Sequence, residues 1–587
     1  MTVLPRLAGL VLLAMAAPGV SVAASFDWLP LQAVQPGMRG VARTVVRGTT
    51  VEAFDVEALA VVPGAGPAGA LILVRASGPV IQRTGGIAGG MSGSPVYFHG
   101  RLAGAIGFGW TFADHSLGLV TPIEVMQSAL PAPRRSQLPP TMAGPWTLPA
   151  PVHAGGRRVA RIAVAASAAP VPPAAAAADV AVMVPLARPL LVSGMGTRAA
   201  ALLQEALGPM GVQPVQGAAG GSTTDRPVLV PGSAVGVQLI RGDLNAVAIG
   251  TLTYRDGERI LAFGHPVLNR GDSAYLLTSA VIHGVVPSAS FPFKIGSAGA
   301  PVGVVAQDRR AGVGGIIGRL PPMVGVRLSV LDGDRGRRAT LGTQVVQDPQ
   351  LGPVLALVSA LDVIDRALDR VGGGTARVRL TLRGRGLDAP IVRENVFYHS
   401  RDIGSAAMLE LPEALRLLFA NEFVRTGPVD VAVEAEVRQA RQTAAVVEAE
   451  LGRPRLRRGD VASVRVTLRP FQGDPVVRDV ELAVPEQFPV GPATVLIRAG
   501  GRPVPEGGLP AALLSEPVET AATSAAEQLA AFADRDRNTD VVVELVPGPA
   551  RFPDITGAAA TRTAKVRVAT PWVVRGRVQL PTAVEGP

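Results

Sequence analysis

The sequence predicts a mainly β protein, and three observations lead to that prediction. Glycine (68) and proline (52) together supply about a fifth of the 587 residues without a three-residue repeat, which excludes a collagen-like chain and favours frequent turns. Hydrophobic residues reach 48% and charged residues only 17%, so the chain can bury several cores. Its β-branched residues gather in short runs between Gly, Pro and Thr, as strands do. At roughly 150 residues per domain, about four domains are expected.

The N-terminus is expected to be a secretory signal over residues 1–24. Arg6 provides the positive charge, Leu7–Ala17 an apolar run, and Ser21–Ala24 small residues for cleavage. The run is short for a membrane span, although an uncleaved anchor is the alternative. No later segment is apolar enough to span a membrane, so the mature chain is expected to be extracytoplasmic, whether periplasmic, envelope-associated or secreted. Cysteine is absent, which excludes disulfides, thiolate zinc sites and cysteine nucleophiles.

The charge pattern predicts no specific nucleic-acid partner. The formal net charge is +10, and 54 of the 56 basic residues are Arg. These arginines are scattered, their densest group (453–458) is short, and only 4% of residues are aromatic. A basic surface of this kind attracts anionic surfaces only weakly.

The first half of the chain divides into three regions. Residues 25–130 carry β-rich runs at 45–46, 54–62 and 70–74. Residues 131–227 are expected to form a Pro- and Ala-rich linker with a helical insert at 198–207. Residues 228–345 return to short strands, with tight turns expected at Asp256-Gly257 and at the charged Asp332-Gly333.

The second half is expected to contain three further regions. Residues 346–450 form an α+β region, with helices near 354–372 and 411–421 and a strand at 376–382. Residues 451–505 alternate like a small β-sandwich, with strands at 462–468, 479–484 and 493–498. Residues 506–587 carry a helix at 517–533 and a strand at 541–546. These regions are expected to bind or position a partner, for example one in the cell envelope. A purely packing role is the alternative.

The most informative segment is the glycine-rich loop around Ser92. Glycines on both sides of a serine permit a strained, exposed loop. Such a loop can aim the backbone N–H groups of Gly90 and Ser92 at one developing oxyanion, as acyl-transfer enzymes require. The alternative is a glycine-rich hairpin that Ser92 merely caps. A strand, a tight turn at His99-Gly100 and a second strand are expected to follow.

This segment also resembles a known family. The run Thr84-Gly-Gly-Ile-Ala-Gly-Gly-Met-Ser-Gly-Ser-Pro95 resembles the nucleophile loop of chymotrypsin-like serine proteases and, more closely, that of the SpoIVB-type peptidases (peptidase family S55). The resemblance implies two chymotrypsin-like β-barrel halves, the first over 25–130 and the second over 228–345. It also implies that Ser92 is the nucleophile; Ser94 is the competing serine.

A serine nucleophile needs a base, and His265 is the candidate among six histidines. It stands in Gly264-His265-Pro266, which follows a Gly250-Thr-Leu-Thr253 strand, and the S55 family carries the same two motifs with that histidine as the base. The alternative is a structural histidine at a strand end. In the family the histidine half precedes the serine half, so the two halves are expected to be permuted here. A triad is defined by geometry, so chain order alone does not forbid catalysis.

The third catalytic position departs from the family. Its Asp corresponds to Ser77, and a serine cannot stabilise an imidazolium by charge; replacing that Asp by its amide in the chymotrypsin template lowers the rate about 10⁴-fold. The chain therefore uses a Ser–His dyad, recruits another acid, or is weakly active or inactive. Asp272 and Asp55 are the candidate acids, and each reads more simply as a turn or surface carboxylate.

Together these features predict an exported serine endopeptidase that cleaves other extracytoplasmic proteins or peptides. The alternative is a catalytically weak or inactive binding protein on a protease-like fold. No cofactor and no metal are expected, because the sequence has no HExxH and no histidines at i, i+4. The Gly-rich segment 311–318 lacks a Walker lysine and is expected to be a strand and turn.

Overall fold

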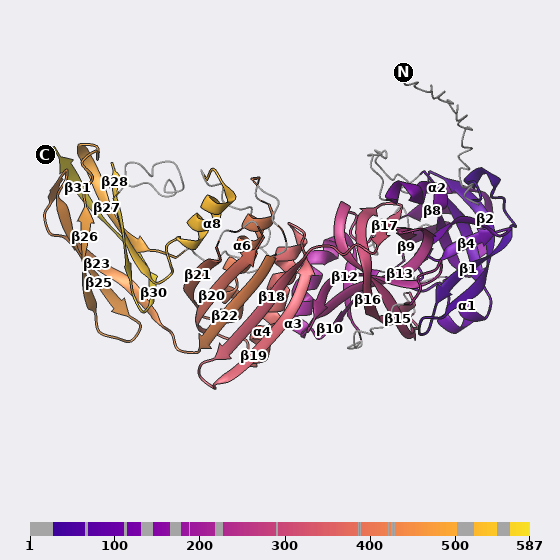
Figure 1. The fold of residues 1–587 in the computed structure, drawn as a ribbon, viewed down its shortest axis with the longest axis horizontal. Coiled ribbons are helices and arrows are strands. Elements are labelled where there is room, and N and C mark those ends of the chain that lie inside the picture. Colours follow the sequence, from indigo (N-terminus) through magenta and orange to yellow (C-terminus); the bar gives the residue numbers. More distant parts are fainter. Residues whose placement is uncertain are drawn as a thin grey trace, which may run out of the picture.

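The computed structural model describes residues 28–586 except 65–68, 111–113, 131–144, 165–177, 187, 218–226, 289–290, 386, 388, 421, 424–426, 428, 502–521 and 549–563. Strands hold 56% of the described residues and helices 15%, so the mainly β prediction is confirmed. Figure 1 shows the units in a row: a first β-barrel, a second β-barrel, an α+β layer and a β-sandwich. The expected signal segment, 1–24, lies outside the described residues.

The first unit, here called the serine barrel, is a closed ring of six strands. Its strands pair in the order β1-β2-β3-β6-β5-β4, and β4 returns to β1. The ring encloses apolar side chains such as Val74, Ile106 and Val120, which are fully buried. Helix α1 precedes the glycine-rich loop, and α2 follows β6. The bounds are β1 Arg39–Val45, β2 Val51–Pro63, β3 Ala70–Ser77, α1 Pro79–Thr84, β4 Pro95–Phe98, β5 Arg101–Trp110, β6 Leu117–Pro122 and α2 Ile123–Met126.

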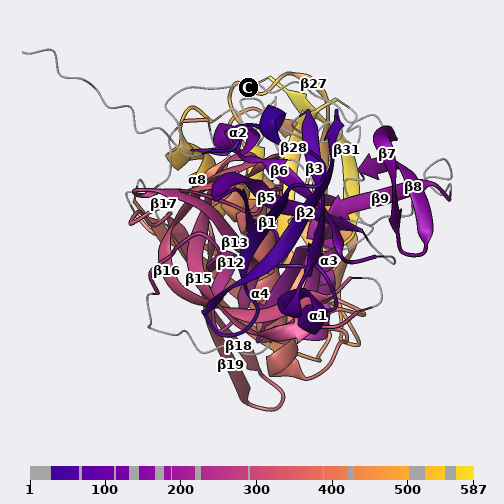
Figure 2. The same ribbon diagram turned by 90° about the vertical axis from the view of Figure 1, so that its right-hand side faces the viewer.

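Three further strands extend the serine barrel at β5. The expected linker therefore contains regular structure: β7 (Trp146–Ala154), β8 (Arg157–Val164) and β9 (Val180–Pro185) form an arm whose last strand pairs with β5. Figure 2 shows this arm beside the barrel. The buried Leu148, Val159 and Met183 explain why it folds, because they share a core with Trp110 of the barrel. The Ala- and Pro-rich segment 165–177 lies outside the described residues.

The second unit, the histidine barrel, has the same ring topology. Its strands pair in the order β12-β13-β14-β17-β16-β15, and β15 closes onto β12. Two strands, β10 and β11, flank it, joined by the expected helix, α3. The predicted Asp256-Gly257 turn joins β13 to β14, and the Gly-rich segment forms β17. The bounds are β10 Arg188–Ser193, α3 Thr197–Leu207, β11 Val212–Gln216, β12 Ala234–Gly242, β13 Asn245–Asp256, β14 Arg259–Ala262, β15 Gly271–Val286, β16 Phe293–Arg309 and β17 Gly312–Ile317.

The third unit is a five-stranded sheet with helices on it, and it continues the second. β19 pairs with β12, so one hydrogen-bonded sheet runs from the histidine barrel into this layer. Helix α4, almost wholly buried, packs on β18 and β19 and against α3 and α6. The order is β19-β18-β22-β20-β21. The bounds are β18 Met323–Asp332, β19 Arg337–Val346, α4 Leu351–Leu368, β20 Gly374–Gly384, β21 Ile391–His399, α5 Ile403–Ala407, α6 Glu410–Phe419 and β22 Val429–Arg438.

The fourth unit is a β-sandwich that is larger than predicted. A four-stranded sheet, β26-β25-β23-β30, faces a five-stranded sheet, β24-β31-β27-β28-β29, across a shared apolar core. Residues 443–585 contribute, so strands expected in a separate C-terminal region complete the sandwich. The bounds are β23 Thr443–Leu451, β24 Arg455–Arg457, β25 Val461–Pro470, β26 Val476–Ala483, β27 Gly491–Ala499, β28 Asp540–Pro547, β29 Ala564–Ala569, β30 Val573–Arg575 and β31 Arg577–Glu585.

Helix α8 (Ala525–Ala533) ties the sandwich to the α+β layer. It packs on α6 and β21, and Leu529 and Phe532 join their core. The buried Arg393 of β21 pairs with Glu410 (3.0 Å) and donates to the carbonyl of Arg535 (2.5 Å), just beyond α8. A buried guanidinium needs such partners, because an unpaired one would be costly. None of the helices in the described ranges combines the length and apolar character of a membrane span.

Candidate active site

The glycine-rich loop that carries Ser92 connects β3 to β4 of the serine barrel. Helix α1 starts with Pro79 and ends at Gly85, which is left-handed at φ 72°. Thr84 closes the helix end by donating its hydroxyl to the carbonyl of Gly86 at 2.6 Å. A proline at the first helical position and a glycine after the last are the residues that such a short helix favours. The glycine-rich loop therefore begins at the end of α1, whose conformation is fixed.

The loop is held mainly by the histidine barrel. Thr251 of β13 donates its amide to the carbonyl of Ser92 (2.7 Å) and its hydroxyl to the carbonyl of Gly90 (3.0 Å). Thr253, on the same strand face, donates its hydroxyl to the carbonyl of Gly93 at 2.7 Å. These are the two threonines of the Gly-Thr-Leu-Thr motif. Their spacing of two residues places them on one strand face, but their role in holding the serine loop was not expected from the sequence.

Gly93 must be glycine for this docking. It is left-handed (φ 92°), and a methyl group there would lie 2.0 Å from the Thr251 carbonyl oxygen and 2.4 Å from the Phe263 nitrogen. Such separations are far inside van der Waals contact. The backbone of the serine loop therefore touches β13 and the segment that leads to His265.

Two amides in the loop are left available. Gly89, Met91, Gly93 and Ser94 each donate their N–H to a backbone carbonyl, whereas among the described residues no acceptor is found for the N–H groups of Gly90 and Ser92. Their peptide planes are nevertheless fixed: the carbonyl of Gly89 accepts from Lys294, and that of Met91 accepts from Ser94, both at 2.9 Å. Because C=O and N–H point oppositely in a trans peptide, both free N–H directions are set.

His265 lies in the equivalent connection of the histidine barrel, between β14 and β15. Phe263 and Gly264 before it are both left-handed, at φ 70° and 63°. A non-glycine residue in this region is uncommon and is typical of functional turns. The Gly264 carbonyl accepts from the Thr121 hydroxyl of the serine barrel at 2.6 Å. The two connections are thus brought together across the barrel interface.

The imidazole of His265 is oriented by a main-chain carbonyl. Nδ1 lies 2.7 Å from the carbonyl oxygen of Pro266. A carbonyl can only accept, so Nδ1 carries the hydrogen and Nε2 is the basic nitrogen of the neutral ring. The ring also packs edge-on against Phe263, with centroids 6.0 Å apart. This bond satisfies the nitrogen that an aspartate holds in the triad template.

Asp308 of β16 is a site residue that the sequence analysis missed. Its two carboxylate oxygens accept the amides of Val267 and Leu268, each at 2.7 Å, and the residue is fully buried. It therefore fixes the backbone just beyond His265. No local sequence signal pointed to it, because it lies 43 positions after His265 and is brought near it by the pairing of β15 with β16.

The other candidate residues are buried or lie on other parts of the surface. Ser94 is fully buried, and its hydroxyl has no partner in the described part of the chain. Ser77, at the family Asp position, lies at the end of β3 opposite Asp55 and lines a shallow surface pocket with Asp114 and His115. The side chain of Asp272 is 81% exposed and pairs with Arg309 at 2.7 Å. Ser92 and His265 are only 2% and 1% exposed.

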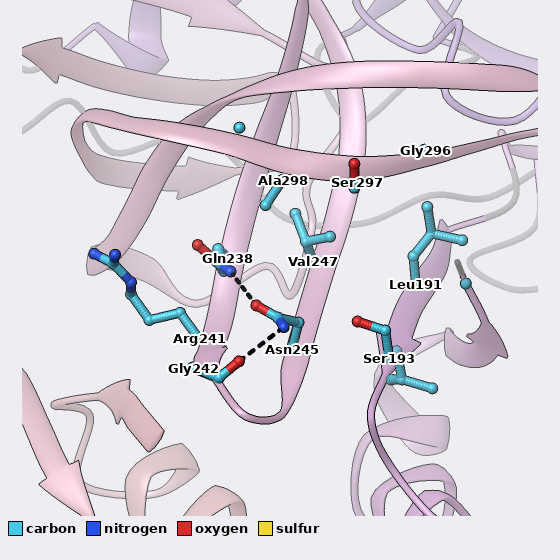
Figure 3. A pocket seen from close by; sticks show the side chains of 13 residues that line it. Leu191, Ser193, Gln238, Arg241, Gly242, Asn245, Val247, Gly296, Ser297 and Ala298 are labelled. Carbon is cyan, nitrogen blue, oxygen red and sulfur yellow. Dashed lines mark hydrogen bonds between the residues drawn. The ribbon is translucent and has the colours of Figure 1, made fainter. Parts of the chain in front are cut away.

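A separate cavity of about 160 Å³ lies in the histidine barrel, between β10, the β12–β13 hairpin and β16 (Figure 3). Two of its polar side chains are linked: Gln238 donates to Asn245 at 3.1 Å, and Asn245 donates to the carbonyl of Gly242 at 3.1 Å. Neither Ser92 nor His265 lines it. In the described ranges no group of three or more His, Asp or Glu residues could hold a metal.

Comparison with known families agrees with the motif. Residues 28–126 match the family model for SpoIVB peptidase S55. The match spans the serine barrel up to α2, so this barrel carries the peptidase pattern that the resemblance implied. It does not extend to His265, and the proposed permutation of the halves stays a prediction. No curated protein and no solved structure is similar enough to match.

Proposed function

We propose that the chain is a serine endopeptidase of the SpoIVB type, with Ser92 as the nucleophile and His265 as the base. The observation that carries this proposal is the pair of fixed amides of Gly90 and Ser92, for which the described residues supply no acceptor, in a loop that the histidine barrel clamps. Backbone N–H groups fixed before the reaction stabilise an oxyanion without reorganisation. The match of residues 28–126 to a peptidase family supports the same reaction class.

In this mechanism the neutral imidazole accepts the Ser92 proton at Nε2 while Oγ bonds to the substrate carbonyl carbon. The carbonyl oxygen becomes an oxyanion that the Gly90 and Ser92 amides stabilise. Collapse breaks the C–N bond, and the imidazolium returns its proton to the leaving amine. Water then hydrolyses the acyl-enzyme by the same proton path. The Pro266 carbonyl keeps Nδ1–H oriented during both proton transfers.

The burial of both residues favours one alternative, an inactive binding protein on this fold. A peptide cannot reach a serine that is 2% exposed unless covering residues move, and Ser77 stands where the family has its acid. In either case we propose an extracytoplasmic location, with protein or peptide ligands and an envelope partner for the C-terminal regions.

A fluorophosphonate probe followed by peptide mapping tests the proposal. Labelling is expected at Ser92, and it should fall to background in Ser92→Ala and in His265→Ala. Ser94→Ala is the matched control and should keep its labelling. If the folded wild-type chain stays unlabelled over prolonged incubation from pH 6 to 9, the binding protein is the better assignment.

A further inference from the structure

Lys294 is a buried basic residue behind the serine loop. The chain uses Arg for 54 of its 56 basic residues, and only Lys294 and Lys565 are lysines. Lys565 is 41% exposed and pairs with Asp536 at 2.7 Å. Lys294 is 1% exposed. One of the two lysines in this arginine-rich chain thus occupies a fully buried position.

Lys294 touches both the serine loop and the first strand of the serine barrel. Its amide donates to the carbonyl of Gly89 at 2.9 Å. Its stem lies along Gly90, where an added methyl group would be 3.0 Å from Cδ and 3.2 Å from Cβ. Its Nζ donates to the hydroxyl of Thr44 in β1 at 2.8 Å. Thr44 in turn lies 3.5 Å, oxygen to oxygen, from the Thr251 hydroxyl that holds Gly90.

The surroundings of Nζ supply no compensating charge. Glu52, opposite Thr44 on β2, pairs with Arg83, and Arg43 stacks on Tyr97. His283 of β15, near the partner of Lys294 on that strand, bonds Ser297. Within the described ranges no carboxylate pairs with Lys294, and burial alone lowers its pKa to about 7. Arginine could not lose its proton here, and methionine could not donate to Thr44.

We propose that Lys294 is a positioning residue: while its amine is neutral, its backbone amide and its side-chain stem hold the Gly89–Gly90 segment of the serine loop in place, and protonation of the amine releases that segment. A charged Nζ has three donors, and the acceptor found for it is the Thr44 hydroxyl. It can reach water only if its stem leaves Gly90 or if the loop moves. Either movement displaces the Gly90 amide. The catalytic consequence rests on the proposed function, whereas the release of the loop does not.

Hydrogen exchange of residues 85–95 at pH 6 and pH 8 tests the release without reference to activity. After correction for the intrinsic pH dependence, the wild-type loop is expected to exchange about ten-fold faster at pH 6, since with a pKa of about 7 the protonated fraction of Lys294 rises from about a tenth at pH 8 to about nine tenths at pH 6. Lys294→Gln keeps a donor but cannot titrate, so its loop should be protected at both values. Lys294→Arg keeps the charge and should be unprotected at both; Lys565→Gln is the control and should behave as wild type.

Equal protection of the wild-type loop at both pH values would overturn the proposal, as would an unchanged pH dependence in Lys294→Gln. A second readout is the pH dependence of the fluorophosphonate labelling rate. Because protonated Lys294 releases the loop, the labelling rate of the wild type should fall more steeply toward acid pH than that of Lys294→Gln, by up to one unit of slope in the logarithmic plot. A chain that never labels refutes the peptidase, and the exchange experiment still decides the role of Lys294.

Discussion

The two barrels share one strand order but build different halves of the candidate site. In each barrel the connection from the third to the fourth strand carries the residue of interest, Ser92 or His265. The serine connection, residues 78–94, is long and rich in glycine, and it offers backbone amides. The histidine connection, residues 263–270, is short and left-handed at its start, and it offers one oriented side chain. The same topology therefore supports two chemical roles through the length and backbone conformation of one connection.

The two barrels also contribute unequally to the contacts that hold each other's connections. The histidine barrel holds the serine loop through Thr251, Thr253 and Lys294. In the other direction, Thr121 of the serine barrel donates its hydroxyl to the carbonyl of Gly264. The conformation of the serine loop is thus a property of the docked pair. Four substitutions or conditions separate the contributions of the two barrels.

The largest expected effect is the pH dependence of stability that Lys294 contributes. The unfolded chain keeps this proton up to its ordinary pKa of 10.5, whereas the folded chain releases it near 7. The unfolded state therefore binds more protons throughout this window, and stability rises with pH. We expect a gain approaching 1.4 kcal/mol per pH unit, at most about 5 kcal/mol in total. Urea denaturation from pH 7 to 10 measures it, and Lys294→Gln should lack this component.

The next effect is steric and tests the interface itself. Gly93→Ala should lower the free energy of unfolding by roughly 3 kcal/mol or more, because its methyl group meets backbone atoms of the other barrel at 2.0 Å. Gly100→Ala is the matched control: it is also left-handed, but nothing lies within 4 Å of its methyl group. Similar losses in both variants would show that conformation, not docking, explains the glycine.

Asp308→Asn probes the histidine connection. One of the two amides that the carboxylate accepts would then face an NH₂ group, which costs about 2 kcal/mol. We expect this loss in thermal or chemical denaturation, together with slower labelling of Ser92. Asp272→Asn, at an exposed ion pair, should change neither measurement. Lost labelling in Asp272→Asn would instead identify that residue as the missing acid.

The smallest expected effect comes from removing one threonine hydroxyl, and it distinguishes a contact between the barrels from a contact within one barrel. Thr251→Val leaves the buried carbonyl of Gly90 without its hydroxyl donor, at a cost of about 1–2 kcal/mol. Thr278→Val removes a longer bond, 3.4 Å, inside the histidine barrel. Only Thr251→Val should also slow Ser92 labelling, because only Thr251 holds the serine loop. Equal slowing in both variants would contradict the one-sided support described above.

Local sequence patterns predicted much of this molecule. The helices α3, α4, α6 and α8, the turns at His99-Gly100 and Asp256-Gly257, and most sandwich strands agree with their hydrophobic periodicity and turn residues. The two closed barrels were expected only from the family resemblance. The pairing of β12 with β19 and the arm β7–β9 were not predicted, because pairing partners far apart in the chain leave no local pattern. Asp308 and Lys294 were missed for the same reason: their roles depend on which residues the strands bring beside them.

The continuous sheet has a mechanical consequence. The chain crosses between the α+β layer and the sandwich several times, and the buried Arg393, which pairs with Glu410 of its own layer, joins the two units through the backbone beyond α8. The α+β layer is in turn hydrogen-bonded to the histidine barrel through β12 and β19. A load that reaches the α+β layer from the sandwich is therefore carried into the histidine barrel as shear along the paired strands β19 and β12. The barrel that clamps the serine loop is thus mechanically coupled to the α+β layer.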